Sequence, residues 1–146
     1  MNADKFTQKT IETIQTAQSM AQENGNQYLM PEHLLYALID ADGGLIGTLL
    51  GRMGVDCNAV LSELDTAIDR LPKVSGGSGE VYASPETSKV FNFAEREAKN
   101  SGDAYVSVEH LMLAIFSEGS QSVRQLLSDH GITKTAFTEA LSKVKT

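Results

Sequence analysis

The sequence contains an internal duplication, and this feature constrains the fold more than any other. Residues 6–67 align with residues 83–144 without a gap, at an offset of 77. The identical pairs are Thr10/Thr87, Ala17/Ala94, Ala21/Ala98, Gly25/Gly102, Tyr28/Tyr105, Glu32/Glu109, His33/His110, Leu34/Leu111, Ala37/Ala114, Leu49/Leu126, Leu50/Leu127, Gly54/Gly131, Ala59/Ala136 and Leu64/Leu141. Most other core-like positions are apolar in both copies. The chain therefore consists of two homologous halves.

A segment rich in glycine and serine separates the two copies. Its centre, residues 75–79, reads Ser-Gly-Gly-Ser-Gly, a composition typical of flexible connectors. We therefore expect a single domain over residues 1–146, with repeat one at 6–70, a linker at 71–83 and repeat two at 84–145. A chain of this length buries about 68% of its unfolded surface, which is enough for a core without disulfides.

Each repeat carries start and stop signals for four helices. Ser84 and Pro85 combine a capping hydroxyl with proline at the first helical position, and Thr7 is the equivalent cap in repeat one. Gly25 and Gly102 suit the left-handed residue that ends a helix. No segment alternates polar and apolar residues for long enough to predict a sheet. We therefore predict an all-α fold of eight helices, arranged as two four-helix repeats related by a pseudo-twofold axis.

The second helix of each repeat is predicted to lie at the centre of the fold. Residues 34–39 and 111–116 are apolar on every side, as expected of a helix that other helices surround. The first helix of repeat two has an apolar stripe instead. At 100° per residue, the members of this stripe are Thr87, Val90, Phe91, Ala94 and Ala98.

Charge and composition argue against several classes of function. The net charge of −7 and the pI near 4.9 disfavour nucleic-acid binding, because phosphate backbones attract basic proteins. The longest apolar run, residues 111–116, is far shorter than the roughly 20 residues that cross a bilayer, and the polar N-terminus is unlike a signal peptide. A single cysteine excludes an internal disulfide. We therefore expect a cytoplasmic protein that binds neither membranes nor nucleic acid.

Few side chains could support catalysis or bind a metal. The pairs Glu32-His33 and Glu109-His110 are equivalent in the two repeats. Adjacent helical residues point about 100° apart, however, so neither pair chelates one ion. Cys57 has no predicted histidine partner, and no glycine-rich loop ends in the Lys-Ser/Thr pair that binds phosphate. We therefore predict a binding module with no catalytic residue, metal or cofactor in this chain.

Phe93 is an apolar residue that the duplicated fold does not require. It lies outside the apolar stripe of its helix, and its partner in repeat one is the polar residue Thr16. An exposed aromatic ring is typical of interaction sites. The same ring could instead pack against the other half of the domain across the pseudo-twofold axis, and the sequence favours neither interpretation.

Short motifs along the whole chain resemble one known family. They are Phe6-Thr7, Ala17-Gln18, residues 31–35 (PEHLL), residues 71–74 (LPKV) before the Gly/Ser linker, Ser84-Pro85 and residues 103–111 (DAYVSVEHL). Together they resemble the double Clp repeat at the N-terminus of the Clp AAA+ ATPases. The linker, residues 70–76 followed by residues 81–85, is most similar to that of the ClpB-type disaggregases.

The resemblance implies a mobile N-terminal domain of a larger, hexameric ATPase. In ClpB-type disaggregases this domain binds exposed apolar segments of unfolded or aggregated proteins and helps to pass them to the central pore, working with the DnaK-type chaperone. ATP and Mg would bind in ATPase modules outside this chain, so the fragment is expected to be a monomer without enzymatic activity. The alternative is a ClpA- or ClpC-type N-terminal domain that docks an adaptor or a substrate for a protease.

The resemblance also implies a substrate-binding site. The positions that match it are Thr7, Val90, Phe91, Phe93, Asp103, Glu109 and His110. Three of these positions have local explanations as well. Thr7 is an expected N-cap, Asp103 follows a glycine in a turn, and Glu109 lies in the first turn of a helix. Both substrate contact and stabilisation of local structure therefore remain open for these three residues.

Overall fold

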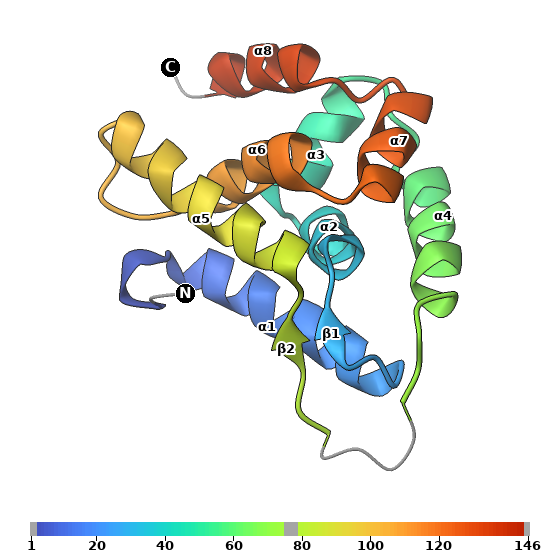
Figure 1. The fold of residues 1–146 in the computed structure, drawn as a ribbon. Helices are drawn as coiled ribbons and strands as arrows, with labels where there is room; N and C mark the ends of the chain where they lie inside the picture. The colour runs from blue at the N-terminus through green and yellow to red at the C-terminus, as the bar shows by residue number, and fades with distance from the viewer. Residues whose placement is uncertain (1–2, 75–78, 145–146) are drawn as a thin grey trace.

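Eight α-helices make up the fold in residues 3–74 and 79–144, the residues described by the structure, a computed structural model (Figure 1). The first four are α1 (Gln8–Glu23), α2 (Pro31–Asp40), α3 (Leu45–Arg52) and α4 (Cys57–Asp69). The second four are α5 (Pro85–Asn100), α6 (Val108–Glu118), α7 (Gln121–Asp129) and α8 (Lys134–Val144). A short 3-10 helix, η1 (Ala3–Lys5), precedes α1. The predicted all-α fold is confirmed, while the Gly/Ser centre of the linker at 75–78 lies outside the described residues.

The first helix of each repeat begins and ends at the predicted signals. The Thr7 and Ser84 hydroxyls accept hydrogen bonds from the backbone N–H three residues later, at 3.2 and 3.1 Å, and so cap α1 and α5. Gly25 and Gly102 follow the two helices with φ of 74° and 75°. Glycine adopts this left-handed backbone without a Cβ clash, so both helices stop at equivalent positions.

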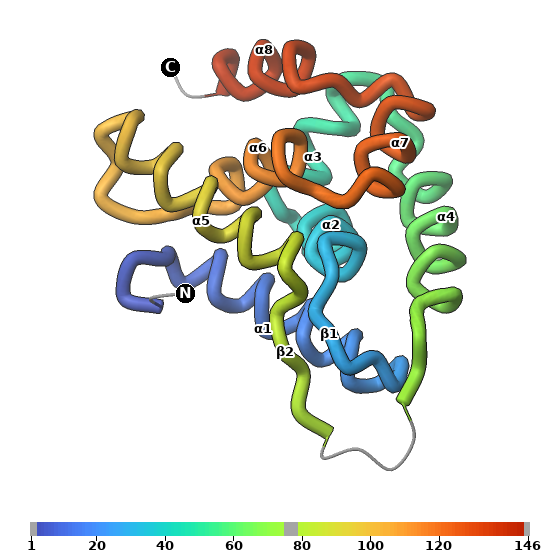
Figure 2. The backbone as a smooth tube through the Cα atoms, in the orientation of Figure 1, coloured from blue at the N-terminus to red at the C-terminus, as the bar shows by residue number. Residues whose placement is uncertain are grey.

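Helices α2 and α6, which were predicted to be central, lie in the middle of the core. Helix α2 contacts α5 and α6, and α3 contacts α6 and α8, so helices of the two repeats interleave. Figure 2 shows α2 in the middle of the fold, viewed nearly along its axis. The predicted stripe of α5 is confirmed, since its buried residues are Thr87, Val90, Phe91, Ala94 and Ala98.

Two short backbone pairings join the repeats, and sequence analysis did not predict them. The strands β1 (Tyr28–Leu29) and β2 (Tyr82–Ala83) are parallel, and Phe6 forms an equivalent parallel bridge with Val106. In both cases the segment before the first helix of one repeat pairs with the segment before the second helix of the other. Strands of two residues are too short to leave an alternating pattern in the sequence.

Hydrogen bonds reinforce both pairings. The N–H of Ser84 donates to the Leu29 carbonyl at 3.1 Å, and the N–H of Thr7 donates to the Val106 carbonyl at 3.0 Å. The buried hydroxyl of Thr87 also donates to the Leu29 carbonyl, at 2.6 Å. The start of α5 is therefore bonded directly to repeat one.

The described residues contain no single helix that is long and apolar enough to cross a membrane. Helices α2 and α3 reach that length and composition only as a pair, and a bend of 78° separates them. Both helices contribute buried side chains to the core.

We expect Thr87→Val to lower the free energy of unfolding by about 1–2 kcal/mol, because it removes a buried hydrogen bond between the repeats while keeping the side-chain shape. Urea denaturation measures this change. Thr66→Val is the matched control, since the exposed Thr66 hydroxyl bonds only within α4, to the Ser62 carbonyl. Its effect should stay within about 0.5 kcal/mol. Equal effects of the two variants would contradict the importance of the bond between the repeats.

Candidate functional site

Two equivalent histidines close the first turns of α2 and α6. The Nδ1 atom of His33 accepts the Met30 N–H, and that of His110 accepts the Ser107 N–H, both at 2.9 Å. Each histidine stands at the third helical position, where a Glu or Gln side chain commonly forms this bond. An accepting Nδ1 places the ring proton on Nε2. The rings are therefore helix caps, a role that sequence analysis missed.

The Nε2 atoms of these histidines also face equivalent residues. His33 Nε2 lies 3.0 Å from Asn26 Oδ1, and His110 Nε2 lies 2.9 Å from Asp103 Oδ2. The repeated seven-residue spacing between these partners is the signal that would have predicted the pairing. Both ring nitrogens are occupied, and the described residues contain no cluster of His, Cys, Asp and Glu suited to a metal ion.

Burial holds His33 in its neutral form. The ring has no exposed surface, and this burial lowers the pKa of His33 from 6.5 to about 4. Protonation would also place a proton on Nδ1, which accepts the Met30 N–H. The neighbouring Glu32 carboxylate is buried too, and it accepts a hydrogen bond from the Ser120 hydroxyl at 3.1 Å. Both side chains of this pair therefore have hydrogen-bond partners within the fold.

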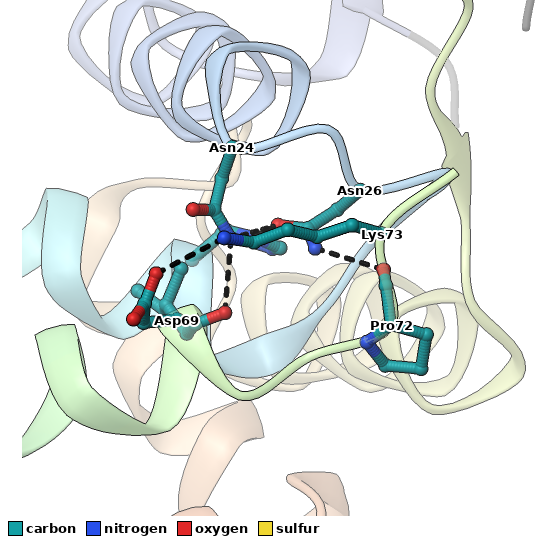
Figure 3. A network of polar contacts seen from close by, with 7 residues as sticks. Asn24, Asn26, Asp69, Pro72 and Lys73 are labelled. Carbon is teal, nitrogen blue, oxygen red and sulfur yellow. Dashed lines mark hydrogen bonds and ion pairs between the residues drawn. The ribbon is translucent and has the colours of Figure 1, made fainter. Parts of the chain in front are cut away.

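In repeat one, the asparagine partner of His33 belongs to a larger polar network (Figure 3). Asn24 Nδ2 donates to Asn26 Oδ1 at 2.9 Å and to the Ile68 carbonyl at 3.0 Å. Asn26 Nδ2 donates to the Pro72 carbonyl at 3.1 Å. The end of α1 is thereby tied to the end of α4 and to the start of the linker.

Three of the predicted substrate-binding residues lie in the interior. Val90 has no exposed surface, Phe91 is 7% exposed and His110 is 3% exposed. The Phe91 ring packs edge-on against Phe6, with 6.3 Å between the ring centroids. These side chains therefore offer almost no surface to a ligand in this structure.

Thr7 occupies the capping position at the start of α1. Its Oγ1 accepts the Thr10 N–H and lies 2.7 Å from Thr10 Oγ1, while its own N–H donates to Val106. A backbone hydrogen bond therefore joins Thr7 to Val106, which lies between Asp103 and Glu109 in the sequence. The polar groups of Thr7 already have partners within the fold.

Phe93 lies at the edge of the core. Its ring is half-buried against core residues, and the Arg96 guanidinium carbon lies 5.5 Å from the ring centroid. This distance is within the range of a cation–π contact. The ring is therefore neither fully exposed nor fully enclosed, since one portion packs against the core and another portion remains accessible.

Asp103 and Glu109 are both at least partly exposed in repeat two. The Asp103 side chain is 42% exposed, and Glu109 is half-buried in the first turn of α6. Asp103 also lines a hollow of about 750 Å³. The hollow lies between the C-terminal part of α5, the loop after it and the segment before α1, and its lining residues are Lys5, Asn92, Glu95, Arg96, Ala98, Lys99, Gly102, Asp103, Ala104 and Val106.

Cys57 is the one thiol in the sequence, and it stands at the start of α4. Burial, followed by the Asp56 carboxylate, raises the pKa of the Cys57 thiol. The thiolate is the reactive form of cysteine, so this shift lowers reactivity at neutral pH. The surroundings of Cys57 suit a structural residue.

Comparison with known proteins decides the family. The sequence profile of the Clp repeat (R) N-terminal domain matches residues 5–130. The chain belongs to this family. The chaperone protein ClpB of Brucella suis biovar 1 (strain 1330) is 40% identical to it over 145 residues, which cover 99% of this chain and 17% of that protein. ClpB of Vibrio cholerae serotype O1 is 38% identical, with the same coverage.

Solved structures share the fold of this Clp repeat domain. The N-terminal domain of Hsp104 from Candida albicans has a TM-score of 0.84 at 21% identity, covering 96% of this chain and 91% of that one. A ClpV N-domain in complex with a VipB peptide has a TM-score of 0.73 at 17% identity, covering 87% and 79%. The chain is thus an N-terminal domain of the Clp-type chaperones, and it spans about 17% of the length of its ClpB relatives.

We expect the free energy of unfolding to fall by on the order of 3 kcal/mol as the pH drops from about 6.5 to 4, from His33 alone. The unfolded chain takes up this proton near pH 6.5, whereas the folded chain takes it up only near pH 4. The neutral ring therefore stabilises the fold at higher pH, and this stability is lost on acidification. Urea denaturation across the pH range measures the effect.

His33→Gln is the matched control for this pH dependence. Glutamine at the same helical position accepts the same backbone N–H but does not titrate. The variant should keep the fold and show a flatter pH profile between pH 6.5 and 4. Identical pH profiles of the variant and the unmodified protein would disprove the role of His33.

Proposed function

We propose that this Clp repeat domain binds exposed apolar segments of unfolded or aggregated polypeptides, as the substrate-binding domain of a ClpB-type disaggregase. The position of Phe93 is the observation that carries the proposal. Its ring is partly accessible on α5, whereas the equivalent residue of α1 is the polar Thr16. An aromatic ring that core packing does not fully enclose supplies apolar surface for a client chain.

The surroundings of Phe93 suit weak and unspecific binding. Arg96 covers part of the ring, and a planar guanidinium on an aromatic face can move aside or stack on an incoming side chain. A small apolar surface with charged neighbours offers few fixed hydrogen-bonding groups, so it places little demand on the client sequence. Weak binding would also allow the client to be released toward the pore.

The comparisons support this choice among functions. The relatives at 38–40% identity carry the name chaperone protein ClpB, and a ClpV N-domain of the same fold was solved with a bound peptide. These relatives support the ClpB-type function over an adaptor-docking domain of a ClpA- or ClpC-type unfoldase. A polypeptide ligand fits both this fold and the partly exposed ring.

Further proposals concern the whole protein. We propose that ATP hydrolysis occurs in modules outside this chain, within a homohexamer that passes clients to its pore and works with the DnaK-type chaperone. The domain itself would then need no cofactor. The single thiol and the absence of a disulfide partner within the sequence fit a reducing cytoplasm.

We expect Phe93→Ala to weaken the binding of an unfolded polypeptide several-fold well below the melting temperature, because it removes the accessible part of the ring. Loss of the half-buried part also lowers the free energy of unfolding. Reduced and carboxymethylated α-lactalbumin is a suitable unfolded probe, and titration followed by NMR reports both affinity and location. Tyr28→Ala is the matched control, since Tyr28 is 47% exposed and lies in repeat one. Unchanged binding by Phe93→Ala, or equal loss with Tyr28→Ala, would refute the proposed site.

For Thr7→Ala we expect a loss of about 1 kcal/mol in unfolding free energy and unchanged client binding well below the melting temperature, because the hydroxyl already caps α1. Ser84→Ala removes the equivalent cap of α5 and serves as the matched control. Melting curves and client titrations of both variants give the comparison. Weaker binding by Thr7→Ala alone, at equal stability, would mean that Thr7 contacts the client.

A further inference from the structure

The linker of this domain covers a backbone edge at the end of α1. The Val74 N–H donates to the Gly25 carbonyl at 2.8 Å, and Lys73 forms an antiparallel bridge with Asn26. The Asn26 side chain adds the hydrogen bond to the Pro72 carbonyl that Figure 3 shows. Repeat one therefore binds an extended segment of polypeptide, which in this case belongs to the chain itself.

The equivalent edge of repeat two is open. Gly102 corresponds to Gly25 and has the same backbone conformation, but its carbonyl accepts no hydrogen bond from the residues that the structure describes. A Cβ atom on Gly25 would lie 3.7 Å from the Lys73 side chain, whereas one on Gly102 would meet nothing within 4 Å. The duplication has thus produced two similar edges, and the linker fills only the first of them.

The open edge borders the 750 Å³ hollow, and the charges there differ from those of the whole chain. Lys5, Arg96 and Lys99 line the hollow together with two carboxylates, Glu95 and Asp103. Across residues 3–74 and 79–144, none of the three cations takes part in an ion pair. In a chain with a net charge of −7, this surface is locally basic and attracts acidic groups.

We propose that the edge formed by residues 102–104 binds an extended acidic segment of a partner polypeptide. The segment lies antiparallel to the edge, as the linker does in repeat one, and donates a backbone N–H to the Gly102 carbonyl. Its carboxylates face Lys5, Arg96 and Lys99. Pairing of this kind draws affinity from main-chain hydrogen bonds and selectivity from the side chains around them. This inference does not depend on client binding at Phe93.

One substitution between the repeats makes the second site weaker than the first. Asn26 donates to the carbonyl of the bound linker, but Asp103 at the equivalent position has only acceptor oxygens when ionised. One of these oxygens accepts from His110, and the carboxylate repels a carbonyl of the bound segment. Binding at repeat two is therefore reversible, whereas the linker is covalently tethered to its own edge.

The test uses a fluorescein-labelled peptide, Leu-Pro-Glu-Val-Glu-Ala, patterned on residues 71–74 with glutamate in place of the lysine. We expect saturable binding by fluorescence anisotropy at concentrations up to about 1 mM, with NMR shifts centred on residues 102–104. Methylation of the peptide's valine nitrogen should abolish binding, because it removes the donor to Gly102. A peptide with lysines in place of both glutamates should bind at least several-fold more weakly.

Variants of the domain complete the test. Lys99→Glu should weaken binding several-fold, and Lys89→Glu is the matched control, since Lys89 is exposed on the same helix but does not line the hollow. Asp103→Asn should strengthen binding by about 2- to 10-fold, because it restores the donor that Asn26 supplies in repeat one. The amide oxygen that this substitution introduces would still accept from His110.

Several results would overturn the proposal. They are absence of binding near 1 mM, equal loss in Lys99→Glu and Lys89→Glu, insensitivity to N-methylation, and shifts confined to other surfaces. Concentration-dependent dimerisation that protects the edge without peptide would also overturn it, because a second copy of the chain would then be the occupant. Sedimentation velocity of the unlabelled domain distinguishes that case.

Discussion

The exchange of backbone hydrogen bonds between the repeats is the constraint on which the rest of the structure depends. The segment before α1 bonds to Val106, and the segment before α5 bonds to Leu29, so each repeat holds the start of the other. These contacts set the position of the central helices α2 and α6, whose apolar surfaces need cover from both repeats. Helices of each repeat pack against one another and also against helices of the other repeat, so the duplicated unit forms one domain.

Duplication also separates the residues that hold the fold from those that are free to differ. His33 and His110 cap equivalent helices with the same hydrogen-bond geometry, since both repeats need that turn closed. Their partners are Asn26 and Asp103, an amide and a carboxylate that satisfy the histidine equally well. The two side chains nevertheless present different groups to a bound chain. The side-chain functional group can therefore differ between the repeats at such positions without loss of the fold.

Helix α5 likewise has buried residues that hold the fold and other residues that are free to differ. Its buried residues stand at the same positions as the buried residues of α1, while Phe93 and Arg96 stand outside that stripe and form a contact of their own. The linker closes the edge beside α1 and leaves the edge beside α5 open. The proposed edge at Gly102 lies on repeat two for this reason, whereas the proposed site at Phe93 lies there because its equivalent in repeat one is the polar Thr16. In repeat one, the edge equivalent to Gly102 holds the linker.

Much of the site could not be read from the sequence, and the reasons are physical. Phe93 could be named as a candidate because its helical angle and its partner Thr16 are visible in the sequence alone. The predicted contacts of Val90, Phe91 and His110 came from resemblance, and burial of these side chains depends on helices distant in the chain. The open edge at Gly102 was not predictable, because only the folded positions of the linker and the loop after α5 define it.

The sequence by itself determined the helices, their ends and the duplication, because capping, glycine conformation and apolar periodicity act over a few residues. Tertiary structure alone decided which repeat covers which face, how the short strands pair and where a groove stays open. Those outcomes depend on contacts between residues tens of positions apart, such as Thr87 with Leu29. Such contacts leave no local pattern, since each partner is an ordinary residue until the fold brings the two together.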